Sequence, residues 1–200
     1  MQNLFASTVY GANAGKPSAI FKKMRPASLA ERPSKMTTLP TVNQIRWPDR
    51  YIPGQAAVFA HNEIVIHAPI ATVWRLLIRA ENWPQWYPNS ADIHFLSHAG
   101  PNLRDRSRIR WNTFGTRITS KVLEFEPETR LAWNAHGIGV DAYHAWLLTP
   151  LADGSTHVLT EETQNGWIAR LGKLLMPKRM ERKHQAWLEA LRLQAQKEAR

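Results

Sequence analysis

Hydrophobic and polar residues alternate through the middle of the chain in a way that predicts β-strands. The first run, residues 58–67, is rich in β-branched residues, and Ala68 and Pro69 end it. Later runs are separated by Gly, Pro, Asn and Asp turn signals: 91–97, 106–113, 116–126, 130–135, 140–149 and 156–165. Because short connections between successive strands require antiparallel pairing, these later runs predict a meander.

Apolar residues at helical spacing follow the first strand. Val73, Trp74 and Leu77 share one face of a short predicted helix, and Pro69 suits its first turn. Residues 83–89 contain two prolines and three aromatic rings, which predicts a turn or a one-turn helix with little conformational freedom.

The C-terminal segment predicts one long amphipathic helix. From Trp167 onward apolar residues recur at every third or fourth position, with Arg and Lys on the opposite face. We expect Pro177 to kink this helix, because a proline inside a helix removes a backbone hydrogen bond. The pattern as a whole predicts an α+β fold, in which a curved antiparallel sheet of about seven strands packs on the long C-terminal helix. Such packing can leave a cavity where large aromatic residues and small residues both point inward.

Composition narrows the chemistry that this chain can perform. A length of 200 residues with 44% hydrophobic residues fits one globular domain plus a tail. The absence of Cys excludes disulfides, thiolate catalysis, Cys-ligated zinc and iron–sulfur clusters. Nine Trp provide more aromatic area than an ordinary core requires, which favours an aromatic-lined interior.

Charge is distributed unevenly. Residues 1–50 hold eight basic residues against two acids, a large part of the net charge of +10, and they lack apolar periodicity. We therefore predict a basic, disordered tail at 1–50 and a folded domain at 51–200. The tail's composition fits an organellar transit peptide, a flexible basic tail or an upstream start codon placed before the real domain. Since no run approaches the roughly 18 apolar residues of a membrane span, we expect a cytoplasmic protein, or an organellar one if the tail is a targeting signal.

A basic band is expected on the outer face of the sheet. Strand alternation places Ile109 and Trp111 on the inner face and the neighbouring basic residues on the other. The outward set is Arg106, Arg108, Arg110, Arg117 and Lys121. These residues form either a solvated sheet face or a band suited to phosphates or anionic lipid headgroups. No nucleic-acid partner is expected, because the chain has no recognised binding motif and its aromatic residues point away from the basic face.

The candidate functional residues lie on predicted inner faces. His144 falls among apolar neighbours, as a general acid or base or as a hydrogen-bonded core residue. One of the adjacent Glu161 and Glu162 must point inward, and because the strand register is not assigned, both join His144 as candidate catalytic residues. The candidate ligand-binding residues are Trp86, Tyr87, Ile109, Trp111, Trp133, Tyr143, Trp146, Met180, His184 and Trp187.

No metal site and no cofactor are expected. His94 and His98 lie in a predicted strand, where four residues span roughly 13 Å, too far for one ion. The glycines at residues 11–16 do not match a phosphate-binding loop, and the chain has no GxSxG elbow.

Several motifs of residues 58–197 carry a resemblance to a known family. They are Ala68-Pro69-Ile70-Ala71-Thr72-Val73-Trp74, Trp83-Pro84-Gln85-Trp86-Tyr87-Pro88, Phe125-Glu126-Pro127-Glu128-Thr129-Arg130-Leu131-Ala132-Trp133, His144-Ala145-Trp146, Thr149-Pro150, Asp153-Gly154-Ser155-Thr156 and Glu161-Glu162-Thr163-Gln164-Asn165-Gly166-Trp167. With these motifs the segment resembles the START-like helix-grip superfamily (SRPBCC), in particular its polyketide cyclase/dehydrase and lipid-transport branch. The resemblance implies a helix-grip fold with a deep hydrophobic cavity between the sheet and the last helix. It implies no catalytic residue, because the superfamily shares no catalytic signature.

Three functions follow from these observations. The first is binding or transport of a small hydrophobic ligand, such as a lipid, an isoprenoid or a polyketide, since burying apolar surface contributes about 25 cal/mol per Å². The second is a cyclase/dehydrase-like enzyme in which His144, with Glu161 or Glu162, moves protons. The third is a membrane-surface or protein-interaction module that uses the basic tail, the outer arginines and the basic face of the terminal helix. The sequence does not decide whether the chain is an enzyme, and the ligand and the oligomeric state stay open.

Overall fold

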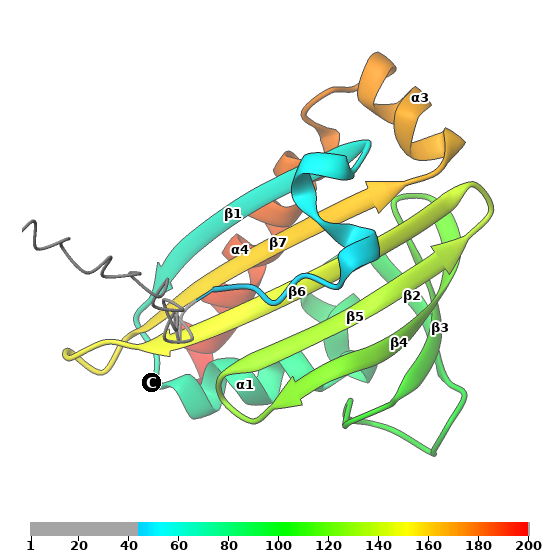
Figure 1. Cartoon of the computed structure of the whole chain (residues 1–200). Helices are drawn as coiled ribbons and strands as arrows, with labels where there is room; N and C mark the ends of the chain where they lie inside the picture. The colour runs from blue at the N-terminus through cyan, green and yellow to red at the C-terminus, as the bar shows by residue number, and fades with distance from the viewer. Residues whose placement is uncertain (1–43, 200) are drawn as a thin grey trace, which may run out of the picture. The chain divides into compact units, whose positions relative to one another are not determined.

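The computed structural model describes residues 44–199 and contains one seven-stranded antiparallel sheet (Figure 1). Its strands are β1 (Val58–Ile66), β2 (Ser90–Phe95), β3 (Arg108–Thr113), β4 (Thr116–Glu126), β5 (Arg130–Gly137), β6 (Val140–Pro150) and β7 (Thr156–Asn165). The strand order β1-β7-β6-β5-β4-β3-β2 confirms the predicted meander, and the first strand pairs with the last. Most of the predicted tail, residues 1–43, lies outside the described residues.

Helices α1 (Ile70–Ile78), α2 (Trp83–Trp86), α3 (Trp167–Leu175) and α4 (Arg179–Glu198) surround one face of the sheet. In Figure 1, α1 and α4 lie behind the sheet, and α3 lies beyond the end where β7 finishes. The fold is therefore α+β, with the long C-terminal helix against the sheet, as predicted. No helix among residues 44–199 is long and apolar enough to cross a membrane.

The prediction of one kinked C-terminal helix is wrong. The helix ends at Leu175, and a new helix begins at Arg179. Met176 has φ −143° and ψ 67°, an extended conformation outside the helical region. Proline disfavours the helical conformation of the residue before it, so Pro177 separates two helices that can take different directions.

The core forms where α4 crosses the inner face of the sheet. Trp187 of α4 is fully buried, its ring stacks on Tyr87 with centroids 4.5 Å apart, and it meets four other indoles edge-on or tilted. These indoles come from α2 and three strands: Trp83, Trp111, Trp133 and Trp146. The predicted inward positions Leu131, Trp133, Ala142, Trp146 and Leu148 all belong to this core, which confirms the alternation in β5 and β6.

A second, smaller cluster lies on the opposite face of the sheet. Tyr143 of β6 packs there against Tyr51 and Trp47, which precede β1. Arg46 forms ion pairs with Glu124 and Glu126 on β4. The segment from residue 44 to residue 51 therefore covers part of the outer face, so folded structure begins upstream of residue 51 (Figure 1).

We expect Trp187→Ala to lower the free energy of unfolding by about 3–5 kcal/mol, because it leaves a large cavity at the point where α4 meets the sheet. Denaturant unfolding followed by circular dichroism measures this change. The control Leu193→Ala truncates an exposed side chain of the same helix and should change stability by less than about 0.5 kcal/mol. Equal effects of the two substitutions would contradict this account of the core.

Candidate functional site

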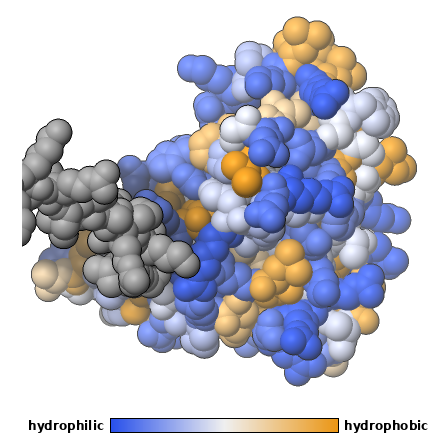
Figure 2. All heavy atoms as spheres, in the orientation of Figure 1, coloured by the Kyte–Doolittle hydropathy of each residue, from blue (hydrophilic) through white to orange (hydrophobic). Residues whose placement is uncertain are grey.

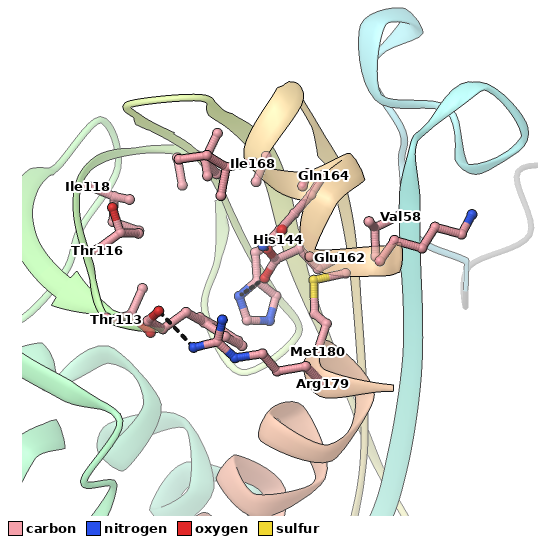
Figure 3. Close-up of a pocket in the computed structure, with 18 of the residues that line it drawn as sticks. Val58, Thr113, Thr116, Ile118, His144, Glu162, Gln164, Ile168, Arg179 and Met180 are labelled. Atoms are coloured by element: carbon pink, nitrogen blue, oxygen red, sulfur yellow. Dashed lines mark hydrogen bonds and ion pairs between the residues drawn. The ribbon is translucent and has the colours of Figure 1, made fainter. Parts of the chain in front are cut away.

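A pocket of about 320 Å³ opens at the α3 end of the inner sheet face (Figure 3). Its walls come from the turn between β3 and β4, from β5, β6 and β7, from α3 and from the start of α4. The apolar lining includes Val58, Trp111, Ile118, Trp133, Ala135, Val140, Ala142, Ile168, Ala169, Met176, Met180 and Trp187. The pocket is thus mainly hydrophobic, and small residues on β5 and β6 leave the space that it occupies.

Two glycines hold α3 over this pocket. Gly166 has φ 103°, and a Cβ there would lie 2.3 Å from the carbonyl oxygen of Gly139 in the β5–β6 turn. A Cβ on Gly139, which has φ 65°, would in turn lie 2.6 Å from the Trp167 ring. The Ile168 amide donates a hydrogen bond of 3.1 Å to the Gly139 carbonyl. Any side chain at either glycine would move α3 away from the sheet.

Three buried polar side chains meet at the inner wall of the pocket. The Oε2 atom of Glu162 on β7 lies 3.2 Å from His144 Nδ1 on β6 and 3.0 Å from His184 Nε2 on α4. The Gln164 amide donates to the other carboxylate oxygen. Since Glu162 and His144 directly face each other in the β6–β7 ladder, the register of the sheet fixes this pair.

One histidine is hydrogen-bonded to the carboxylate. A carboxylate oxygen can only accept, so the His184 Nε2 atom that faces it carries the hydrogen, whereas His144 Nδ1 lies 3.2 Å from the same oxygen without a hydrogen bond. His144 Nε2 lies in hydrogen-bond contact with the Thr160 hydroxyl at 2.8 Å, and that hydroxyl donates to the Ala145 carbonyl at 3.1 Å. Glu162 thus receives one N–H group from His184 and one from the Gln164 amide, and the Nδ1 atom of His184 is buried without a hydrogen-bond partner.

Burial and neighbouring groups shift the pKa values of His144 and Glu162. Burial lowers the pKa of His144 to about 3, and the attraction of Glu162 offsets burial only in part. Burial alone would raise the pKa of the Glu162 carboxyl, but the groups of His144, His184 and Gln164 that face it bring its pKa below the usual range. The site therefore contains an ionised carboxylate beside the neutral imidazole of His144.

These three side chains are also a potential metal-binding set, since their ligand atoms lie within 4.8 Å of one another. The orientation of the rings opposes this use. The His144 and His184 rings stack with centroids 4.6 Å apart and planes inclined by 16°. Imidazole lone pairs lie in the ring plane, and two nearly parallel planes cannot both contain an ion about 2 Å from each nitrogen. Metal binding would require one ring to turn, so this arrangement fits hydrogen bonding better.

The structure brings part of the predicted site together. The pocket lining includes His144, Glu162, Trp111, Trp133, Met180 and Trp187, and His184 lies behind the lining in contact with Glu162. The other predicted residues lie outside the pocket lining: Tyr87, Ile109 and Trp146 belong to the hydrophobic core, and Trp86 packs against it.

Two predicted site residues lie on the other side of the sheet. Glu161 points outward and pairs with His61 at 2.7 Å, so Glu162 is the inward glutamate. Tyr143 also points outward, where residues 45–51 cover it. Strand alternation makes both placements consistent with the inward His144 and Glu162.

A second set of pocket residues was not predicted. Arg179 reaches across the pocket to donate a 3.0 Å hydrogen bond to the Phe114 carbonyl in the β3–β4 turn (Figure 3). Lys173 and the residues 113–116 also line the pocket mouth. These segments meet only through tertiary packing, which leaves no local signal. Gln164 could have been found, because it lies two residues from Glu162 on the same strand face.

A curved antiparallel sheet with a pocket between its inner face and a long C-terminal helix defines a helix-grip protein. The chain belongs to the family described as polyketide cyclase / dehydrase and lipid transport, whose model matches residues 59–196. No curated protein sequence matches the chain significantly.

Solved structures with the same fold include a hypothetical protein of Helicobacter pylori, 33% identical, with a TM-score of 0.73 over 78% of this chain and 99% of that one. The Zhui aromatase/cyclase of a Streptomyces species is 16% identical, with a TM-score of 0.61 over 72% of this chain and 96% of that one. A START superfamily protein of Mycobacterium smegmatis is 13% identical, with a TM-score of 0.59 over 70% and 97% of the two chains. The last two similarities establish the fold alone.

The buried histidine gives stability a defined pH dependence. Folding keeps His144 neutral, whereas the unfolded chain protonates it below its ordinary pKa of 6.5. The unfolded state therefore binds more protons, so the free energy of unfolding should fall as the pH falls from about 7 to about 4.5. Glu162 acts in the same direction at lower pH, because its pKa in the folded protein is depressed.

We expect His144→Gln to flatten this dependence, since the glutamine amide does not titrate. Urea unfolding at several pH values measures the slope. His94→Gln removes an exposed imidazole and is the matched control. A slope that is the same in His144→Gln and in the unmodified protein would show that His144 is not held neutral.

Proposed function

We propose that this protein binds a small, mainly apolar ligand that carries a hydroxyl or amine group. The observation that supports this most directly is the 320 Å³ pocket with indole walls and one ionised carboxylate at its inner end. The membership in a family described as polyketide cyclase / dehydrase and lipid transport supports the same class of ligand. The ligand could be a lipid fragment, an isoprenoid or a polyketide-like molecule.

The size of the pocket favours a compact ligand. Pockets that bind drug-sized molecules have volumes of roughly 300–1,000 Å³, and this one lies near the lower bound. Burial against Trp111, Trp133 and Trp187 provides the apolar contact, at about 25 cal/mol for each Å² removed from water. A ligand of one to a few rings fits these walls better than a complete phospholipid does.

The polar end of the ligand should be a donor. A carboxylate offers about four lone-pair positions, and the hydrogen bonds from His184 and Gln164 occupy two of them at Glu162. Acceptor capacity therefore remains for an O–H or N–H group in the pocket, and that group would fix the ligand's orientation. At the mouth, Lys173 and Arg179 favour a ligand whose outer end is neutral or anionic.

A second candidate function is acid–base catalysis on a bound ligand, because His144 and Glu162 both line the pocket. General acid–base groups work best when their pKa lies near the working pH, and both of these groups have a depressed pKa. We therefore rank binding ahead of catalysis. If a ligand isolated from the protein is converted on incubation, His144→Gln should slow that conversion by about 10²–10⁴-fold if the imidazole is an acid–base group.

Titration with the fluorescent probe N-phenylnaphthylamine, which has apolar rings and one N–H, tests the proposal. We expect saturable binding with energy transfer from the pocket tryptophans. Ala142→Phe fills the pocket from β6 and should weaken binding at least about tenfold, because the space for the rings is lost. Ala91→Phe makes the same change at an exposed position and should leave binding unchanged.

A second variant separates pocket filling from misfolding. Gly172 lines the pocket from α3, and a Cβ there would meet no atom within 4 Å. Gly172→Phe therefore fills the same space without a backbone clash and should also weaken binding. Probe affinity that is unchanged in both filled variants would reject the pocket as a ligand site.

A further inference from the structure

Helix α3 carries an apolar surface that the fold leaves uncovered. Trp167, Leu171, Leu174 and Leu175 recur at spacings of three and four and project from the face opposite the pocket. We define the α3 patch as these four residues together with Ile138 in the β5–β6 turn. The exposed fraction is 80% for Ile138, 79% for Leu174 and 63% for Trp167. Figure 2 shows hydrophobic residues at this end of the molecule beside hydrophilic ones.

The opposite face of α3, which points toward the pocket, packs against the rest of the protein. Ala169, Gly172 and Met176 line the pocket, and the helix begins at the close contact between Gly139 and Gly166. The α3 patch is therefore not needed to hold the helix in place. A cluster of large apolar side chains in water points to a contact outside this chain.

Basic residues are concentrated in α3 and around the start of α4. They are Arg170, Lys173, Lys178, Arg179, Arg182 and Lys183, against the single acid Glu181 between residues 166 and 183. In the described part of the chain, none of these cations forms an ion pair with a carboxylate. Lys173 and Arg179 donate to backbone carbonyls, which leaves their charge uncompensated.

We propose that the α3 patch docks on the surface of an anionic lipid bilayer, with the pocket mouth at the membrane. Leucine and tryptophan side chains flanked by Lys and Arg are the composition that inserts at the boundary between headgroups and acyl chains. Lys173 of α3 and Met176, which directly follows α3, line the pocket, so the pocket lies beside the helix that carries the α3 patch. Docking would therefore bring the mouth next to the lipid.

The positive charge near the α3 patch favours an anionic bilayer over a second copy of this chain as its partner. In a two-fold dimer the same patch is present on both subunits, so the cations around the two patches would face each other. Such juxtaposed like charges oppose association. An anionic membrane instead attracts each Lys or Arg near its surface. The docking depends on this surface alone, so it holds or fails independently of ligand binding in the pocket.

Sedimentation of the full chain with phosphatidylcholine vesicles, with and without phosphatidylserine, tests the proposal. We expect binding that requires phosphatidylserine and weakens as salt is added. Leu174→Ser with Leu175→Ser should reduce the partition coefficient about tenfold or more, because it removes two inserting side chains. Leu123→Ser with Leu193→Ser removes two exposed leucines elsewhere and should have little effect.

Two double charge-reversal variants identify which basic residues contact the membrane. Lys178→Glu with Arg182→Glu should also reduce binding about tenfold or more, whereas Arg108→Glu with Arg110→Glu on the outer sheet face should not. Greater sensitivity to the outer arginines would assign the contact to the sheet and overturn the proposal.

Insertion has a separate signature that a basic tail cannot produce. Lipids brominated along the acyl chains quench only tryptophans that enter the bilayer, and Trp167 is the exposed tryptophan of the described residues. We expect quenching that disappears in Trp167→Phe. Vesicle binding without quenching would overturn the proposal, and so would concentration-dependent dimerisation that Leu174→Ser with Leu175→Ser abolishes.

Discussion

The insertion of Trp187 into the inner face of the sheet is the contact on which the rest of this structure depends. A curved antiparallel sheet exposes an apolar inner face that cannot remain in water, and α4 is the element that crosses it. One indole on α4 reaches rings from α2, β3, β5 and β6 at once. These rings fill the middle of the inner face completely. Beyond them, β5 and β6 present Ala135, Val140 and Ala142, and the pocket lies where their small side chains end.

A buried carboxylate lies at the boundary between the indole core and the pocket. Glu162 is buried, and an unpaired buried carboxylate would be strongly unfavourable. His184 and the Gln164 amide donate hydrogen bonds to it, and His184 comes from α4, so the closing helix is tied to β7 by a polar contact as well as by Trp187. Removing one partner would leave the charge uncompensated, which is why such networks are usually complete or absent. The Glu162 carboxylate, held by His184 and Gln164 and still able to accept a hydrogen bond from the pocket, is suited to selecting a donor group on a ligand.

The meander and the inward faces of β5 and β6 could be predicted, because alternation with period two is a local property of each strand. The choice between Glu161 and Glu162 could not, although it follows once His144 is placed inward and the β6–β7 register pairs it with Glu162. Register is a pairing between strands, and a slip of one residue reverses every side chain.

Other features depend on contacts that no local pattern reports. Tyr143 was expected among the ligand-binding residues, but it lies on the outer face of the sheet, where Trp47 and Tyr51 cover it. The mouth of the pocket brings Arg179 to Phe114, residues that are far apart in the chain. The break at Pro177 was located correctly but its effect was underestimated, since the residue before the proline leaves the helical region altogether.

Helix α3 shows how one short element can meet two separate requirements. A helix of nine residues is marginal by itself in water, so α3 depends on tertiary contacts, and its inner face and the Gly139–Gly166 contact provide them. Polar residues on the outer face would serve the fold equally well and would keep that surface soluble. The outer face is instead leucine and tryptophan, which favours aggregation unless a partner covers it. Stability therefore explains the inner half of α3 but not the outer half, and only a contact with another surface accounts for both.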